Sequence, residues 1–243
     1  MEVHGRYLTS RLAAAAFCLI LVTPCAPAAE EQVAVKKFTV NAGTNTEPFP
    51  ENTYVLYHKA SLDAVLVDPG APDKRIADFI SQTHLIVRTI LNTHGHSDHT
   101  RANRFFANTY GVKIRGPWKD RDLYEDAENK PDEWLKEETT IMFGSLGIRI
   151  LATPGHTPGS LCFLAEENLL SGDTLFAGSI GKSFGETEEQ KRENEKLEIS
   201  SIRLKLLPLD ATTWVWPGHG ALTTIWDEAS ANPFLRDRNQ ALF

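Results

Sequence analysis

The feature that most constrains this chain is the stretch THGHSDHTRAN at 93–103, which places three histidines and an aspartate within six positions. The whole chain of 243 residues has only 8 histidines. The apolar run IVRTILNTH at 86–94 predicts a strand that leads into this stretch, and TRANRFFANTYG at 100–111 predicts a helix after it. The histidines are therefore expected on a loop that a strand end holds in place, which is a common position for reactive groups.

The spacing of the four side chains indicates a metal site. His94 and His96 are two positions apart, so on an extended backbone their side chains point the same way and can reach one point. Asp98 and His99 lie past the turn and can reach a second point. A lone histidine is more often a surface residue or a helix cap, but several imidazoles packed together without a metal would repel one another when protonated. Nitrogen and oxygen ligands of these types suit zinc or a similar divalent ion.

Three further candidate ligands each follow a β-rich run and a glycine. They are His156 in TPGHTPGS, Asp173 in LLSGDTLFAG and His219 in WPGHGALTT. A neighbouring glycine lets the backbone approach a crowded centre because it has no Cβ. The recurrence of this pattern predicts that the three strand ends share one rim with the histidine cluster.

The remaining pattern predicts β-sheets with helices packed outside them, in the α/β class. Strands are expected at 33–40, 52–58, 62–70, 86–94, 112–115 and 147–156, as a pair within 160–173, and at 212–220. Helices are expected at 72–83 and 100–111, in a charged region at 117–138, and from the capping box Thr187-x-x-Gln190 to about Leu207.

The first 28 residues have the pattern of a secretory signal peptide. A basic start with Arg6 and Arg11 precedes the apolar run LAAAAFCLILV at 12–22 and an A-x-A-like end, which predicts cleavage near Ala28. A periplasmic or secreted protein is expected, with 29–243 as a single domain and no stable membrane contact after cleavage. A retained anchor, a transit peptide and lipidation at Cys25 are the alternatives.

Charge and cysteine content exclude some functions. The chain has 25 basic and 32 acidic side chains and no basic stripe, so nucleic acid is not an expected partner. Of the 3 cysteines, only Cys162 lies beyond the signal segment, so no internal disulfide is expected there. Its alternating strand context favours a buried structural thiol.

HGHSDH followed in order by His156, Asp173 and His219 resembles the metallo-β-lactamase superfamily over about residues 33–235. The resemblance implies a four-layer αββα sandwich with two metals at one edge. It also implies the ligands: His94, His96 and His156 for the first metal, Asp98, His99 and His219 for the second, and Asp173 bridging both.

Within the superfamily, the segments at 153–163 and 171–184 resemble the glyoxalase II branch, the hydroxyacylglutathione hydrolases, and 218–235 resembles its short bacterial members. The commonest zinc β-lactamases have a cysteine where Asp173 stands. Lys182 matches a lysine that contacts glutathione in the long enzymes of the branch. Phe184 stands where those enzymes have an aromatic hydroxyl, and only 24 residues follow His219, where they have a helical substrate domain.

The resemblance implies a thioesterase that acts on a small molecule through a metal-bridging hydroxide. Asp98 would be both a ligand and the catalytic residue that orients the nucleophile, and Lys182 would bind a substrate anion. Zinc is the expected metal, with iron or manganese as alternatives, and the oligomeric state stays open. Three other functions are retained: an exported lactone or β-lactam hydrolase, a mononuclear-iron persulfide dioxygenase, and a metal-binding module without turnover.

Overall fold

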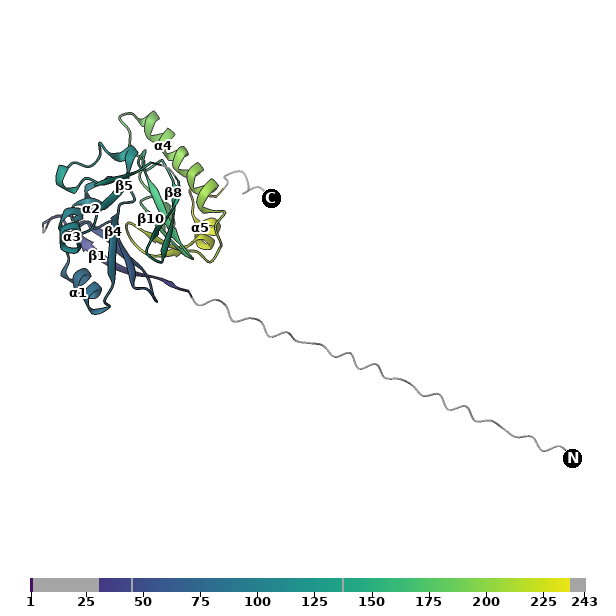
Figure 1. The fold of residues 1–243 in the computed structure, drawn as a ribbon. Coiled ribbons are helices and arrows are strands. Elements are labelled where there is room, and N and C mark those ends of the chain that lie inside the picture. Colours follow the sequence, from purple (N-terminus) through teal and green to yellow (C-terminus); the bar gives the residue numbers. More distant parts are fainter. Residues whose placement is uncertain (2–30, 45, 137, 237–243) are drawn as a thin grey trace. The chain divides into compact units, whose positions relative to one another are not determined.

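Two six-stranded sheets face each other at the centre of this computed structural model, and helices cover their outer faces (Figure 1). The structure describes residues 1, 31–44, 46–136 and 138–236. From Glu31 onward the chain forms one compact unit. Apart from Met1, the segment predicted as a signal peptide lies outside the described residues.

The first sheet contains six consecutive strands in chain order. Its first three strands are antiparallel, and the pairs from β3 to β6 are parallel. The strands are β1 (Val33–Asn41), β2 (Pro50–His58), β3 (Asp63–Val67), β4 (Ile86–Leu91), β5 (Ile114–Pro117) and β6 (Glu133–Leu135). The predicted strands in this half are confirmed to within a few residues at their ends.

The second sheet has the order β14-β13-β10-β9-β8-β7 and is antiparallel except where β10 pairs with β13. Its strands are β7 (Thr140–Phe143), β8 (Leu146–Ala152), β9 (Leu161–Ala165), β10 (Asn168–Gly172), β13 (Trp214–Pro217) and β14 (Thr223–Thr224). The expected pair within 160–173 is β9 and β10. A small separate hairpin, β11 (Leu175–Phe176) and β12 (Ser179–Ile180), follows β10.

Three apolar clusters hold the layers together. The cluster between the sheets joins Leu56 and Val67 of the first sheet to Ile148 and Phe163 of the second. A second cluster packs α1 (Lys74–Gln82) and α3 (Asn103–Tyr110) on the outer face of the first sheet. A third packs the end of α4 (Glu188–Ser201), its π-helical continuation Ile202–Leu206 and α5 (Ile225–Ala231) on the second sheet. This arrangement is the four-layer αββα sandwich, as predicted.

The expected helical region at 117–138 is wrong. The chain instead forms two 3₁₀ turns, η1 (Trp118–Asp120) and η2 (Ala127–Asn129), and then β6. The charged residues there do not cover a helix face; Glu133 forms ion pairs with Lys113 and Arg115 next to it in the first sheet. Composition alone therefore indicated the wrong element, because these charges pair across strands.

One other helix prediction differs in detail, and one is confirmed at its start. The helix expected at 100–111 is split into α2 (Ser97–Thr100) and α3, and Gly111 ends α3 with φ of 66°, a left-handed conformation that favours glycine. The capping box of Thr187 and Gln190 is present at the start of α4. Among the described residues, no helix is long and apolar enough to cross a membrane.

Candidate metal centre

All seven predicted ligands lie together at the carboxyl ends of strands from both sheets. The segment after β4 supplies four of them, and one each follows β8, β10 and β13. The members are His94, His96, Asp98, His99, His156, Asp173 and His219. The glycine-flanked strand ends therefore share one rim, as their sequence pattern indicated.

The first group contains three imidazoles. Nε2 of His156 lies 3.1 Å from Nδ1 of His96. His94 completes the group, and one nitrogen from each of the three rings lies within 4.8 Å of the others. Atoms that share a tetrahedral zinc ion at its usual bond lengths lie ~3.3 Å apart, so these rings converge as the ligands of one ion do.

The second group contains one carboxylate and two imidazoles. Nε2 of His99 lies 3.3 Å from Nε2 of His219. Oδ2 of Asp98 lies 3.2 Å from Nε2 of His219 and 3.4 Å from Nε2 of His99. Three ligand atoms thus converge on a second point.

The carboxylate of Asp173 lies between the two groups. Its Oδ1 atom is 3.3 Å from Nε2 of His99, and its Oδ2 atom is 3.6 Å from Nε2 of both His156 and His219. The carboxylate of Asp173 therefore contacts imidazoles of both groups, which is where the sequence placed the predicted bridging residue.

Hydrogen bonds at the other ring nitrogens fix four of the five imidazoles. Nδ1 of His156 donates to the carbonyl oxygen of Lys182 at 2.9 Å, and Nδ1 of His219 donates to that of Pro50 at 2.7 Å. Nδ1 of His94 is 3.0 Å from Oγ1 of Thr93, and Nδ1 of His99 lies 3.2 Å from Oδ2 of Asp68. In each case Nε2 is the ring nitrogen that faces the shared centre, the arrangement that outer partners impose on metal-binding histidines.

The donor set fits divalent metal ions. Nε2 of His94 and Oδ1 of Asp173 are buried and have no hydrogen-bond partner, and such orphaned atoms are costly unless something binds them. Burial and the neighbouring imidazoles lower the pKa of His94 well below its usual value, and burial lowers the pKa of His156 to about 4. Both rings are therefore neutral at pH 7, which is the form that binds a metal.

The second group carries a proton when no metal is bound. Burial opposes the charged form of His99, but the carboxylates of Asp173 and Asp68 together raise its pKa well above its usual range. A metal ion in this group must displace that proton, so its affinity is expected to weaken as pH falls.

Glycine is required next to one of the ligands. A Cβ on Gly218 would lie 2.3 Å from Oδ1 of Asp173 and 2.6 Å from Cε1 of His99. The backbone before His219 thus passes closer to the ligands than any other residue type permits, which supports the sequence argument for glycine at this strand end.

Sequence reasoning missed two buried carboxylates that hold the ligand loops. Asp68 directly follows β3, and its Oδ2 atom lies 3.2 Å from Nδ1 of His99. The sequence showed only that Asp68 belongs to a DPG turn, not that it contacts a candidate ligand. Asp120 accepts hydrogen bonds from the backbone N–H of Gly95 at 3.1 Å and of Gly159 at 2.6 Å, and from Oγ1 of Thr157 at 2.7 Å. No pattern in the sequence marks Asp120, because its partners come from two distant loops.

A cavity of about 590 Å³ opens over the candidate ligands. Lys182 lines it and is exposed, with Nζ 5.7 Å from the ring centre of Phe184. Phe184 and Phe49 contact the ligand rings themselves, with centroids 5.2 Å from His96 and 5.1 Å from His219, respectively. The mouth of the site is therefore apolar, and Lys182 is its one cationic side chain apart from the histidines among the described lining residues.

Comparison with known proteins agrees with this geometry. The sequence profile of the metallo-beta-lactamase superfamily matches residues 46–219. The chain is 36% identical to the hydroxyacylglutathione hydrolase GloC of Haemophilus influenzae, over 73% of this chain and 89% of that protein. Among solved structures, it resembles BLEG-1, a B3 metallo-beta-lactamase, with a TM-score of 0.73 and 31% identity, over 84% of this chain and all of that one. It also resembles TTHA1623 in a di-iron-bound form, with a TM-score of 0.66 and 32% identity, over 82% of this chain and 100% of that one.

The fold and the paired ligand groups, together with these similarities, define a metal-dependent hydrolase. The chain belongs to the metallo-beta-lactamase superfamily, and glyoxalase II-like enzymes are among its homologues.

Proposed function

We propose that this protein is a binuclear metal-dependent thioesterase of the glyoxalase II type. The observation that carries the proposal is the position of Asp173, whose carboxylate lies within 3.6 Å of imidazole nitrogens of both ligand groups and lines an open cavity. The similarity to GloC supports a thioester as the substrate.

In this proposal His94, His96 and His156 would hold one divalent ion, Asp98, His99 and His219 would hold a second, and Asp173 would contribute to both. The bound ions would polarise a carbonyl group as Lewis acids and would lower the pKa of a water molecule. Zinc is the proposed metal because the ligands are nitrogen and oxygen atoms; iron, which the TTHA1623 structure contains, and manganese are the alternatives.

The side chains that line the cavity would position the reactants. Asp98 lies in the wall of the cavity, where its carboxylate can accept a hydrogen bond from the attacking water and direct it toward the substrate carbonyl. The apolar side chains of Phe49, Phe176 and Phe184 would pack on the acyl group and exclude bulk water. Lys182 would bind an anionic group on the substrate.

Phe184 argues against tight recognition of glutathione itself. A phenylalanine cannot donate the hydrogen bond that an aromatic hydroxyl would provide. The proposed substrates are therefore thioesters with an apolar acyl group and an anion on the thiol portion. This description covers glutathione thioesters without requiring them.

The test is a substrate panel on protein loaded with zinc, iron or manganese. Thioesters should be hydrolysed with a kcat/KM at least tenfold above that for lactones and β-lactams. The similarity to BLEG-1 makes β-lactam hydrolysis the second candidate, and a preference for a β-lactam would establish it instead. One iron per chain together with oxygen consumption would identify a persulfide dioxygenase.

We also propose that the protein is exported, on the basis of the basic, apolar and small-residue pattern of 1–28. After expression in a bacterial host with a secretion pathway, the N-terminus of the secreted protein should begin close to Ala29. Soluble, active protein that keeps Met1 inside the cell would refute the proposal.

A further inference from the structure

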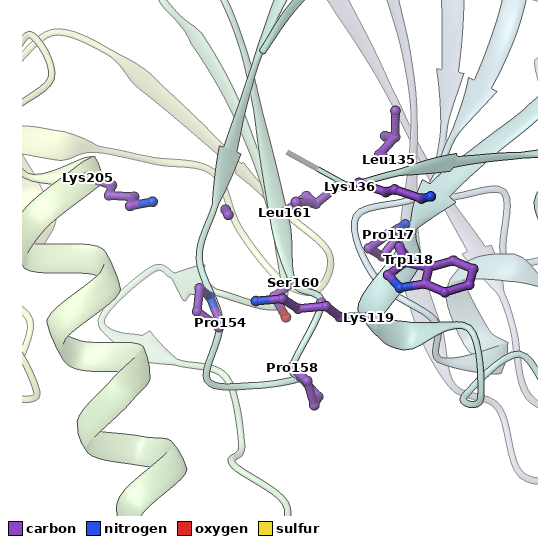
Figure 2. Close-up of a pocket in the computed structure, with 12 residues that line it drawn as sticks. Pro117, Trp118, Lys119, Leu135, Lys136, Pro154, Pro158, Ser160, Leu161 and Lys205 are labelled. Carbon is purple, nitrogen blue, oxygen red and sulfur yellow. The ribbon is translucent and has the colours of Figure 1, made fainter. Parts of the chain in front are cut away.

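A second cavity, of about 220 Å³, lies beside the loop that carries His156, but no candidate metal ligand lines it (Figure 2). One wall is formed by the end of β5 and by η1, another by β6, and a third by the end of β8 and the loop 154–161 that follows it. Lys205, in the π-helical continuation of α4, completes the lining.

Apolar side chains form most of this second cavity. They are Pro117, Trp118, Leu135, Ala152, Pro154 and Leu161. Trp118 is 39% exposed, and the guanidinium carbon of Arg121 lies 4.7 Å from its ring centre. A cavity of roughly 150 Å³ lined by apolar groups binds benzene, so this one has room for a single ring with a short substituent.

Three lysines lie around the same cavity. Figure 2 shows Lys119 extending from η1 toward Ser160, Lys205 pointing from its helix toward the cavity, and Lys136 pointing to the opposite side, above Trp118. Lys205 pairs with Glu138, whereas Lys119 and Lys136 have no ion-pair partner among the residues that the structure describes. Nζ of Lys136 lies 5.1 Å from the ring centre of Trp118.

This grouping of cations is notable because the chain as a whole is acidic, with a net charge of −7. Lysines without acidic partners around an apolar cavity favour a ligand that has both an apolar body and a negative charge. A carboxylate is a suitable acceptor for the ammonium group of Lys119, and an aromatic ring suits the apolar walls.

We propose that this second cavity binds a small aromatic monocarboxylate, with its ring among the apolar side chains and its carboxylate paired with the ammonium group of Lys119. The cavity is separate from the metal centre, although Trp118 and Asp120 belong to the same 3₁₀ turn and Asp120 anchors both ligand loops.

Calorimetric titration of the metal-loaded protein with benzoate and phenylacetate tests the proposal. Both should bind at one site per chain, and benzyl alcohol, which has no charge, should bind at least tenfold more weakly. The double variant Lys119→Ala/Lys136→Ala should weaken carboxylate binding at least tenfold while metal content and thioester hydrolysis stay unchanged. The control Lys196→Ala removes another exposed lysine, outside the cavity lining, and should bind as the unaltered protein does.

A second variant distinguishes binding in this cavity from binding at the metal ions, which can also bind carboxylates. Ala152→Leu fills the cavity without altering any charge, and it should abolish binding while the ligand groups stay intact. Carboxylate binding that survives both the double variant and Ala152→Leu belongs to the metal centre or the general surface and overturns the proposal. Absence of binding to the unaltered protein at millimolar concentrations, or equal affinity for benzyl alcohol, also overturns it.

Discussion

Oδ2 of Asp68 lies 3.2 Å from Nδ1 of His99, and both side chains are buried. The same oxygen accepts a hydrogen bond from Oγ1 of Thr93 at 2.6 Å, and that hydroxyl lies 3.0 Å from Nδ1 of His94. One carboxylate therefore orients a histidine in each ligand group, directly in the second group and through a threonine in the first.

Asp68→Asn should weaken metal binding by roughly 10–100-fold, because the amide is a poorer partner for the histidine N–H. The backbone should tolerate the change, since Asp68 has φ of 49° and asparagine accepts this region readily. Metal affinity would be measured by competition with a chromophoric chelator. Asp63→Asn is the control, because Asp63 is also buried but binds Arg88 and Ser145 instead of a ligand; unchanged affinity in Asp68→Asn would show that Asp68 only stabilises the loop.

Asp173→Ala should lower the metal content and reduce hydrolysis to background. The reason is geometric, since the carboxylate of Asp173 lies within 3.6 Å of imidazole nitrogens of both groups. Metal content would be measured by mass spectrometry after dialysis, beside Asp210→Ala, which removes an exposed carboxylate outside both groups. A variant that retains two ions and full turnover would show that Asp173 is only a strand-end residue.

Lys182→Ala should raise KM for an anionic thioester about tenfold, because a charge-assisted hydrogen bond of about 1–2 kcal/mol is lost. KM for a neutral thioester should change little, and metal content should not change, because the atom that binds His156 is the backbone carbonyl of Lys182. Steady-state kinetics on the two substrates provide the measurement. If both substrates lose efficiency equally, Lys182 does not contact the substrate anion.

The buried carboxyl group of Glu198 makes the stability of the fold depend on pH. It is buried on α4 and accepts hydrogen bonds from the backbone N–H of Gly181 at 3.0 Å and from Oγ of Ser183 at 3.1 Å, the residues on either side of Lys182. Burial raises the pKa of Glu198 from 4.5 to about 8. Between pH 4.5 and about pH 8 the folded protein therefore holds a proton at Glu198 that the unfolded chain has released. Over this range the contribution of Glu198 to the free energy of unfolding falls as pH rises.

Glu198→Gln mimics the protonated carboxyl and cannot titrate. The free energy of unfolding of the unaltered protein, relative to that of this variant, should fall between pH 5 and pH 8 and level off above that range. Urea denaturation of both proteins at several pH values measures the difference. A difference that is constant across the range would mean that Glu198 is ionised in the folded state throughout.

The sequence was sufficient to predict which side chains gather at the candidate metal centre, because the signal for each of them is local. Histidine spacing at 94–99 and the glycine before His156 and His219 are visible without the fold, and the alternation of apolar residues located most of the strands of both sheets. The region 117–138 was misassigned because its charges are paired across neighbouring strands, which a helix pattern does not reveal.

The residues that hold the candidate ligands in place could not be predicted from the sequence. Asp120 binds groups that are 25, 37 and 39 residues away, and Asp68 binds His99 across 31 residues. Any buried aspartate has the same local appearance, so only the tertiary structure distinguishes an anchor of the ligand loops from an ordinary turn residue.

The most direct test of a binuclear centre is a metal titration of the metal-free protein, with thioester hydrolysis followed at each step. Two ions should bind per chain and hydrolysis should reach its maximum only with the second equivalent, because the proposed centre is binuclear and Asp173 lies near both ligand groups. Full activity with a single ion, or a chain that binds only one ion at saturation, would contradict it.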